Sequence, residues 1–113
     1  MKIKDIYRQV ALIKIDAEVT PHSFMSESYH KSIVLHPEDE MRICLPCPNG
    51  TCTERVKVID ADRLRAAIDS ALQGDGTFEI ETRCEGWEDE ERERDGNYHC
   101  DSKFILRGYV LSV

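Results

Sequence analysis

The sequence predicts a single α+β domain over residues 1–113, with a mostly antiparallel sheet of about five to six strands and one helix packed on one face. Three observations predict this class. The length of 113 residues suits one ordinary domain. Several segments alternate apolar and polar residues, as strands do, and one segment repeats its apolar residues at helical spacing. Turn residues separate these segments, and their order along the chain is β-β-β-β-α-β-β.

Four strands are predicted ahead of the helix. Residues 10–19 alternate with period two, and residues 29–36 form a second strand that ends before a proline. Residues 41–47 and 51–59 are expected to form the two arms of a hairpin. Asn49-Gly50 lies between these arms, and this dipeptide readily takes the positive φ values of a type I′ turn.

The helix is predicted for residues 61–73. Asp60 is a plausible N-cap, and Gly74 suits the left-handed conformation that often closes a helix. One stripe of the helix is apolar, at positions i, i+3, i+4, i+7 and i+8, and consists of Leu64, Ala67, Ile68, Ala71 and Leu72. A helix with one apolar side must bury that side, and the sheet is the expected surface.

Two further strands follow the helix, at residues 77–84 and 98–113. In the first, Phe78, Ile80 and Cys84 lie on one face. The second carries apolar residues on both faces, which is typical of a strand in the middle of a sheet.

Charge is distributed unevenly along the chain. The net charge is −7, and residues 1–57 contribute none of it because they hold eight acidic and eight basic residues. An acidic balance argues against direct binding of nucleic acid through a basic face. No apolar stretch approaches the about 20 residues of a membrane helix, and no secretory leader is evident. We therefore expect a cytoplasmic protein that does not bind membranes.

The five cysteines carry the strongest chemical signal, which is Cys44-x-x-Cys47 followed by Cys52. Closely spaced cysteines in a turn rich in Pro and Gly are typical of zinc knuckles. A structural zinc ion needs four ligands, and this segment supplies three. The metal hypothesis assigns these three to Cys44, Cys47 and Cys52, and the fourth to Cys84, His99 or Cys100.

Other interpretations of the cysteines stay open. Free cysteine is often simply buried as a small apolar residue. Cys84 and Cys100 are expected to be neighbours at the base of a hairpin, as reduced thiols or as a disulfide, and Cys47 and Cys52 to face each other across the Asn49-Gly50 turn. An enzyme that uses Cys100 with His99 is a further alternative. Adjacent strand residues point to opposite faces, however, so we expect no enzymatic activity.

Residues 85–95, the acidic segment, hold seven acidic and two basic residues around the only tryptophan. The plain interpretation is a solvated loop or a short frayed helix, with Trp87 packed at its root. The alternative is a protein interface in which Trp87 is the anchor and carboxylates form the rim. Its partner would be a larger protein with a basic surface, such as a nucleic-acid-binding groove. The predicted contact residues are Glu85, Trp87, Glu88, Asp89, Glu90, Glu91, Glu93 and Asp95.

The function expected from these features is a non-enzymatic, inhibitory binding protein. In composition the chain is similar to small phage- or prophage-encoded inhibitors and regulators. The alternative is a small zinc-stabilised structural or regulatory module. An open sheet edge also permits strand pairing between copies, so the expected state is a monomer or a homodimer.

Overall fold

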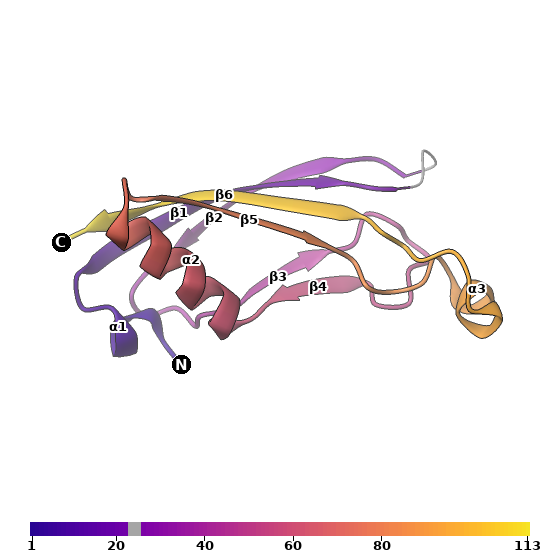
Figure 1. The fold of residues 1–113 in the computed structure, drawn as a ribbon, viewed down its shortest axis with the longest axis horizontal. Helices are drawn as coiled ribbons and strands as arrows, with labels where there is room; N and C mark the ends of the chain where they lie inside the picture. The colour runs from indigo at the N-terminus through magenta and orange to yellow at the C-terminus, as the bar shows by residue number, and fades with distance from the viewer. Residues whose placement is uncertain (23–25) are drawn as a thin grey trace.

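The structure, a computed structural model that describes residues 1–22 and 26–113, confirms the α+β class and the predicted order of strands and main helix (Figure 1). It adds two short helices, one near the N-terminus and one inside the acidic segment. The elements are α1 (Ile3–Ile6), β1 (Val10–Thr20), β2 (Tyr29–Leu35), β3 (Ile43–Pro46), β4 (Val56–Ile59), α2 (Ala61–Gln73), β5 (Thr77–Arg83), α3 (Glu90–Asp95) and β6 (Lys103–Ser112).

Within the described residues, six strands form two antiparallel sheets rather than one. The larger sheet has the order β2-β1-β6-β5, so the last strand lies in the interior of the sheet, as its apolar faces indicate. The smaller sheet is the β3–β4 hairpin, in which Ile43 is opposite Ile59. Four residues of each strand pair, and one further backbone hydrogen bond, at Cys47, precedes Pro48, which cannot donate a ladder hydrogen bond.

The core lies between the larger sheet and a second layer made of α2 and the β3–β4 hairpin (Figure 1). The Asp60 carboxylate accepts a hydrogen bond from the backbone N–H of Arg63 at 3.0 Å and caps α2 as predicted. Leu64 and Ile68 on its apolar stripe are fully buried, and α2 packs against β5 and β6. No helix in the described ranges has both the length and the apolar character needed to cross a bilayer.

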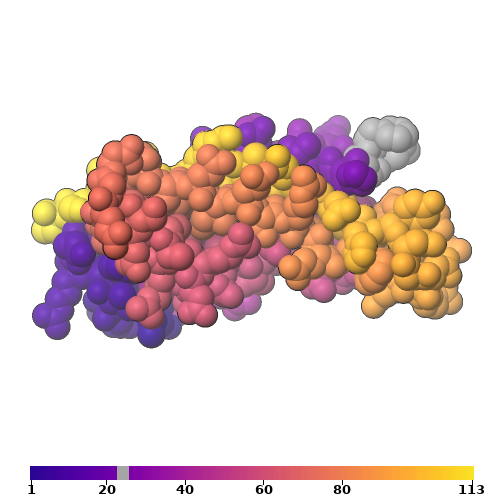
Figure 2. Space-filling view, in the orientation of Figure 1, coloured from indigo at the N-terminus to yellow at the C-terminus, as the bar shows by residue number. Residues whose placement is uncertain are grey.

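The molecule is elongated, with extents of 50 × 23 × 20 Å. Its radius of gyration is 15.6 Å, whereas a compact chain of this length has about 13 Å. Both termini and α2 lie at one end, and the other end tapers into the β3–β4 loop and α3 (Figure 1). Residues 47–55 and 84–102 are named the distal end here. In the space-filling view, residues around α3 form a knob that projects beyond the sheet layers (Figure 2).

Candidate metal centre

Four cysteine side chains meet inside the distal end. The Sγ atoms of Cys47, Cys52, Cys84 and Cys100 all lie within 4.8 Å of one another. The shortest separations are 3.3 Å between Cys47 and Cys100 and 3.4 Å between Cys52 and Cys84. A tetrahedral zinc ion with Zn–S bonds of about 2.3 Å separates its sulfurs by about 3.8 Å. The four sulfurs therefore already have nearly the spacing that one tetrahedral ion requires.

The loop between β3 and β4 supplies two of these cysteines. The backbone N–H of Cys47 donates to the carbonyl of Arg55 at 2.7 Å, so the hairpin ladder continues one residue past β3. Cys52 donates its N–H to the carbonyl of Asn49 at 3.2 Å, which closes a tight turn. The Asn49 side chain stabilises this turn by accepting from the hydroxyl of Thr51 at 3.0 Å. This turn brings both sulfurs to the same side of the loop.

The hairpin between β5 and β6 supplies the other two. Cys84 donates its N–H to the carbonyl of Ser102 at 2.9 Å, and Cys100 donates to the carbonyl of Gly86 at 2.8 Å. These bonds extend the β5–β6 ladder toward the acidic segment. Cys84 continues the alternation that buries Phe78 and Ile80, so its side chain is on the core face. The two hairpins thus face each other with two sulfurs each.

The cluster is closed to solvent on most sides. Cys52 is 1%, Cys84 2% and Cys100 4% exposed, and Cys47 is half-buried. Ser102, which is fully buried, places its hydroxyl 3.3 Å from the sulfur of Cys100 and 3.5 Å from that of Cys47. A closed set of four thiols has the form of a structural metal site, because a catalytic zinc site keeps one position open.

The thiols differ in their affinity for protons. Burial raises the pKa of Cys47 to about 11, although a hydrogen bond with Ser102 opposes the shift. Burial also raises the pKa of Cys84 far above its usual value. Burial acts in the same direction on Cys100, but hydrogen bonds from Ser102, Cys47 and Cys52 together outweigh it, and the pKa of Cys100 is lowered. A metal ion that binds as the tetrathiolate must therefore displace at least the protons of Cys47 and Cys84.

These pKa shifts predict a steep pH dependence of metal affinity. Two thiols hold their protons throughout the neutral range, so the affinity should fall by at least about 100-fold for each pH unit lost between about pH 8 and pH 6. Competition with a chromophoric chelator, corrected for the chelator's own protonation, measures this slope. An affinity that is constant over this range would contradict binding through these thiols.

Cys44, the first of the predicted ligands, is not part of the cluster. Strand alternation in β3 buries Ile43 and Leu45 and leaves Cys44 exposed on the opposite face. Cys47 follows the end of the strand and turns toward the core side. The predicted triplet is therefore corrected in one member. The alternation of β3 places Cys47, and not Cys44, on the same face as Ile43 and Leu45. This alternation could have excluded Cys44, but the Cys-x-x-Cys spacing suggested that both cysteines were ligands.

The sequence offered three residues as alternatives for the fourth ligand. Cys84 and Cys100 were two of three candidates for a single fourth ligand, and the structure brings both to the cluster. His99, the third candidate, instead stacks its ring on Trp87 with the centroids 4.0 Å apart. Among the described residues, no histidine hydrogen-bonds to Cys100. Its sulfur contacts Cys47, Asn49 and Ser102, none of which is a base.

Gly86 permits the close contact between the two hairpins. A Cβ atom at this position would lie 3.0 Å from the sulfur of Cys52 and 2.7 Å from Cγ of Glu54. A rotamer change can move Cγ of Glu54, but neither its Cβ, which is also 3.0 Å away, nor the buried sulfur of Cys52 can move in this way. Gly86 was not recognised from the sequence, because only the packed structure shows what it approaches.

Gly86→Ala is therefore expected to disturb the cluster. We predict a loss of about 1–3 kcal/mol in the free energy of unfolding, as for overpacked sites, together with weaker metal binding. Gly50→Ala is the matched control, since a Cβ there meets nothing within 4 Å. Urea denaturation and metal titration of both variants measure the effects. Equal unfolding free energies and equal metal affinities of the two variants would show that the close contact between Gly86 and Cys52 is unimportant.

The acidic segment forms a capped helix that emerges between two cysteines of the cluster. The Asp89 carboxylate accepts from the N–H of Arg92 at 2.8 Å, and Gly96 ends α3 in the left-handed conformation with φ of 72°. None of the residues of α3 is buried. The guanidinium of Arg92 lies over the ring of Tyr98, 5.1 Å from its centroid. The acidic segment is therefore a helical projection, which agrees with the short helix predicted as one alternative.

Trp87 is half-buried at the root of this projection. Its backbone N–H donates to the hydroxyl of Thr53 at 2.9 Å, and its carbonyl accepts from the N–H of Thr53 at 3.2 Å. The carbonyl of Glu88 accepts from Asn49 and Thr51 of the same loop, at 3.1 and 2.7 Å. The acidic segment is thus fastened directly to the loop that carries Cys47 and Cys52.

The carboxylates of the acidic segment are not neutralised locally. Within the described ranges, every ion pair lies elsewhere in the molecule. Glu85, Glu90, Glu91, Glu93 and Asp95 are exposed, whereas Glu88 and Asp89 are half-buried. The knob in Figure 2 is therefore a face with net negative charge.

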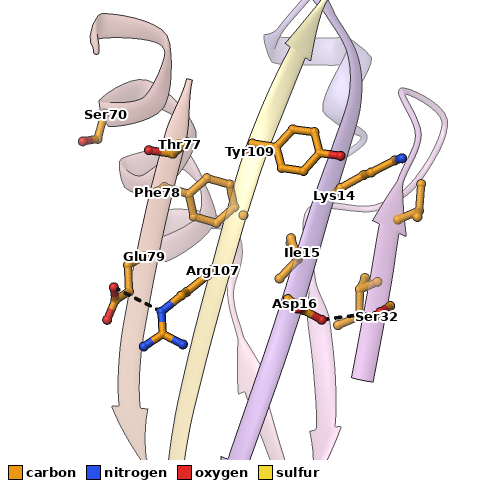
Figure 3. Close-up of a pocket in the computed structure, with 13 residues that line it drawn as sticks. Lys14, Ile15, Asp16, Ser32, Ser70, Thr77, Phe78, Glu79, Arg107 and Tyr109 are labelled. Atoms are coloured by element: carbon orange, nitrogen blue, oxygen red, sulfur yellow. Dashed lines mark hydrogen bonds and ion pairs between the residues drawn. The ribbon is translucent and has the colours of Figure 1, made fainter. Parts of the chain in front are cut away.

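A hollow on the outer face of the larger sheet gives a contrast. Its charged lining residues are Lys14, Asp16, Glu79 and Arg107, two of each sign. Arg107 pairs with Glu79 at 3.6 Å, and Asp16 accepts from Ser32 at 3.4 Å (Figure 3). Charge in this hollow is therefore balanced, in contrast to the acidic segment, whose net charge is −5.

Comparison with protein-family models, with curated proteins and with solved structures finds no match to this chain. The chemistry of the site therefore rests on its own geometry. Four mutually close cysteines, three of them buried, can hold one metal ion.

Proposed function

We propose that this protein is a small protein-binding module whose acidic end is held in place by one zinc ion. The observation that supports it most is the convergence of four sulfurs from two separate hairpins within 4.8 Å. Four thiolate ligands in a tetrahedron favour zinc over the hard cations, which prefer oxygen. The ion would stabilise structure and not take part in a reaction.

The position of the ligands links the metal to the acidic segment. Cys84 precedes the segment and Cys100 follows it, while Cys47 and Cys52 lie in the loop that contacts Trp87 and Glu88. An ion at the cluster fixes both ends of residues 85–99 against that loop. A helix as short as α3, with no buried residue, gains little stability of its own. The ion therefore presents the carboxylates in a defined arrangement.

The exposed carboxylates support a partner with a basic surface. Seven acidic and two basic residues give this segment a net charge of −5, concentrated on a projecting knob. Such a field accelerates encounter with a positive surface and favours correct orientation. The proposed partner is a larger protein, and covering its nucleic-acid groove would inhibit it. The proposed compartment is the reducing cytoplasm, where four thiols remain available to zinc.

A comparison of matched baits tests the partner proposal. The variant Glu90→Gln with Glu93→Gln removes two charges from the exposed face of α3. Its control, Glu27→Gln with Asp62→Asn, removes two exposed charges outside the distal end. Wild-type and control baits should enrich the same protein from a lysate of the native host, as measured by mass spectrometry, and the α3 variant should lose it. Equal enrichment by all three baits would reject the acidic interface.

A further inference from the structure

We propose that the same four cysteines have a second, metal-free state in which disulfides Cys47–Cys100 and Cys52–Cys84 replace the zinc ion. The inference deepens the proposed metal centre by assigning to it a defined site of oxidation. Four thiols allow three ways of forming two disulfides. The geometry of the distal end selects one of them.

Distances between the sulfur atoms favour the pairs that link one hairpin to the other. Cys47 and Cys100 are 3.3 Å apart, and Cys52 and Cys84 are 3.4 Å apart. A disulfide bond is about 2.05 Å long, so each pair needs to close by little more than 1 Å. The two pairs share no atom, and both disulfides can therefore form in one molecule.

The backbone register disfavours a bond between Cys84 and Cys100. Cys84 is opposite Ser102 in the ladder and Cys100 is opposite Gly86, so the two cysteines are diagonal neighbours. Diagonal residues in an antiparallel pair lie roughly 7 Å apart, whereas the Cβ atoms of a disulfide lie about 3.5–4.5 Å apart. Since Cys84 is then left for Cys47 or Cys52, the shorter separation assigns it to Cys52.

The chemistry of the conversion balances with a hydroperoxide as oxidant. Hydrogen peroxide oxidises one thiolate to a sulfenic acid, and its O–O bond breaks with release of hydroxide. The partner thiolate attacks the sulfenic sulfur, forms the S–S bond and displaces a second hydroxide. Two peroxides thus convert four thiolates into two disulfides and four hydroxides. The sulfurs lose four electrons, the peroxides gain them, and the zinc ion leaves with its charge unchanged.

The two disulfides would keep the architecture of the distal end. Each one joins the β3–β4 loop to the β5–β6 hairpin, as the metal does. Bonds within a segment, Cys47–Cys52 and Cys84–Cys100, would instead leave the loop and the hairpin unconnected. The preferred pairing therefore releases zinc while the acidic segment stays attached to the loop at Thr53.

Peptide mapping tests this pairing. Zinc-loaded protein and chelator-treated protein, both carrying Cys44→Ser, are treated with hydrogen peroxide, alkylated and digested without reduction. The expected products are Cys47–Cys100 and Cys52–Cys84 peptides and a mass loss of about 4 Da. A chromophoric chelator measures the zinc that is released, and about two peroxides should be consumed for each ion. Bonds within a segment, or sulfinic acids in place of disulfides, would overturn the inference.

Two double variants keep the test independent of zinc. In the Cys44→Ser background, Cys47→Ser with Cys100→Ser leaves the near pair Cys52 and Cys84, whereas Cys47→Ser with Cys84→Ser leaves Cys52 and Cys100. Neither variant holds four ligands, so both are compared without metal. We expect the near pair to form its disulfide at least about tenfold faster. Equal rates would contradict the pairing. A protein that holds no zinc but forms the expected disulfides would refute the metal centre alone.

Discussion

Replacing Cys84 and Cys100 together with serine is expected to abolish zinc binding and to unfold the distal end while the rest of the domain stays folded. Two thiolates cannot provide the closed four-coordinate site, and serine is a poor zinc ligand. Zinc contributes about 10–16 kcal/mol of apparent binding free energy in small zinc-dependent units, and this energy is also folding energy. The variant loses this folding energy at the distal end, where few other contacts stabilise the structure.

Most residues of the hydrophobic core lie outside the distal end, including Leu64 and Ile68 of α2. Helix α2 packs against β5 and β6 of the larger sheet and lies toward the end of the molecule opposite α3 (Figure 1). Hydrogen exchange of residues 84–101 should therefore accelerate by at least about 100-fold in the variant, while β1 and α2 remain protected. Cys44→Ser is the control, and this variant should bind zinc and exchange like the wild type. Unchanged protection of the distal end in the double variant would show that the cysteines are only core packing.

Reversing charge on α3 is expected to weaken binding of the captured partner by about 100-fold at low salt. The variant is Glu90→Lys with Glu93→Lys, two exposed positions one turn apart. Asp89 is left unchanged because its carboxylate caps α3. The matched control is Glu27→Lys with Asp62→Lys. Affinity is measured by calorimetry with the purified partner.

Salt dependence separates this electrostatic mechanism from simple packing. The Debye length falls from about 10 Å at 0.1 M salt to about 3 Å at 1 M. Wild-type affinity should thus fall steeply over this range, and the reversed variant should show a much shallower slope. An affinity that does not change with salt would mean that Trp87 and its neighbours bind the partner by packing. The carboxylates would then be solvated and would not contribute to binding.

Local sequence patterns accounted for the elements of this fold but not for their assembly. The capped helix at residues 61–73 and the alternation in residues 10–19 depend on neighbours in sequence, and both are observed. The division into two sheets depends on which strands pair with each other, and this pairing joins segments that are distant in sequence. The sequence indicated only that Pro46 and Pro48 weaken pairing within the β3–β4 hairpin, and not that the hairpin would separate from the larger sheet.

The cysteine cluster also depends on both local and long-range contacts. The interpretation favoured Cys44 because Cys-x-x-Cys is a familiar local spacing, although alternation with Ile43 and Leu45 turns that side chain away. Cys84 and Cys100 were recognised as neighbours within their own hairpin. Their approach to Cys47 and Cys52 joins residues more than 30 positions apart, and depends on Gly86 allowing the hairpins to touch. No pattern in one sequence encodes such a contact.

Metal content of the purified protein tests the central claim most directly. Protein prepared without chelators is analysed by inductively coupled plasma mass spectrometry beside the Cys84→Ser, Cys100→Ser variant. We expect about one zinc per wild-type chain, and less than about a tenth of an equivalent in the variant. Wild-type protein that is fully reduced and folded, yet holds no more zinc than the variant and takes up none on titration, would contradict a zinc-held distal end.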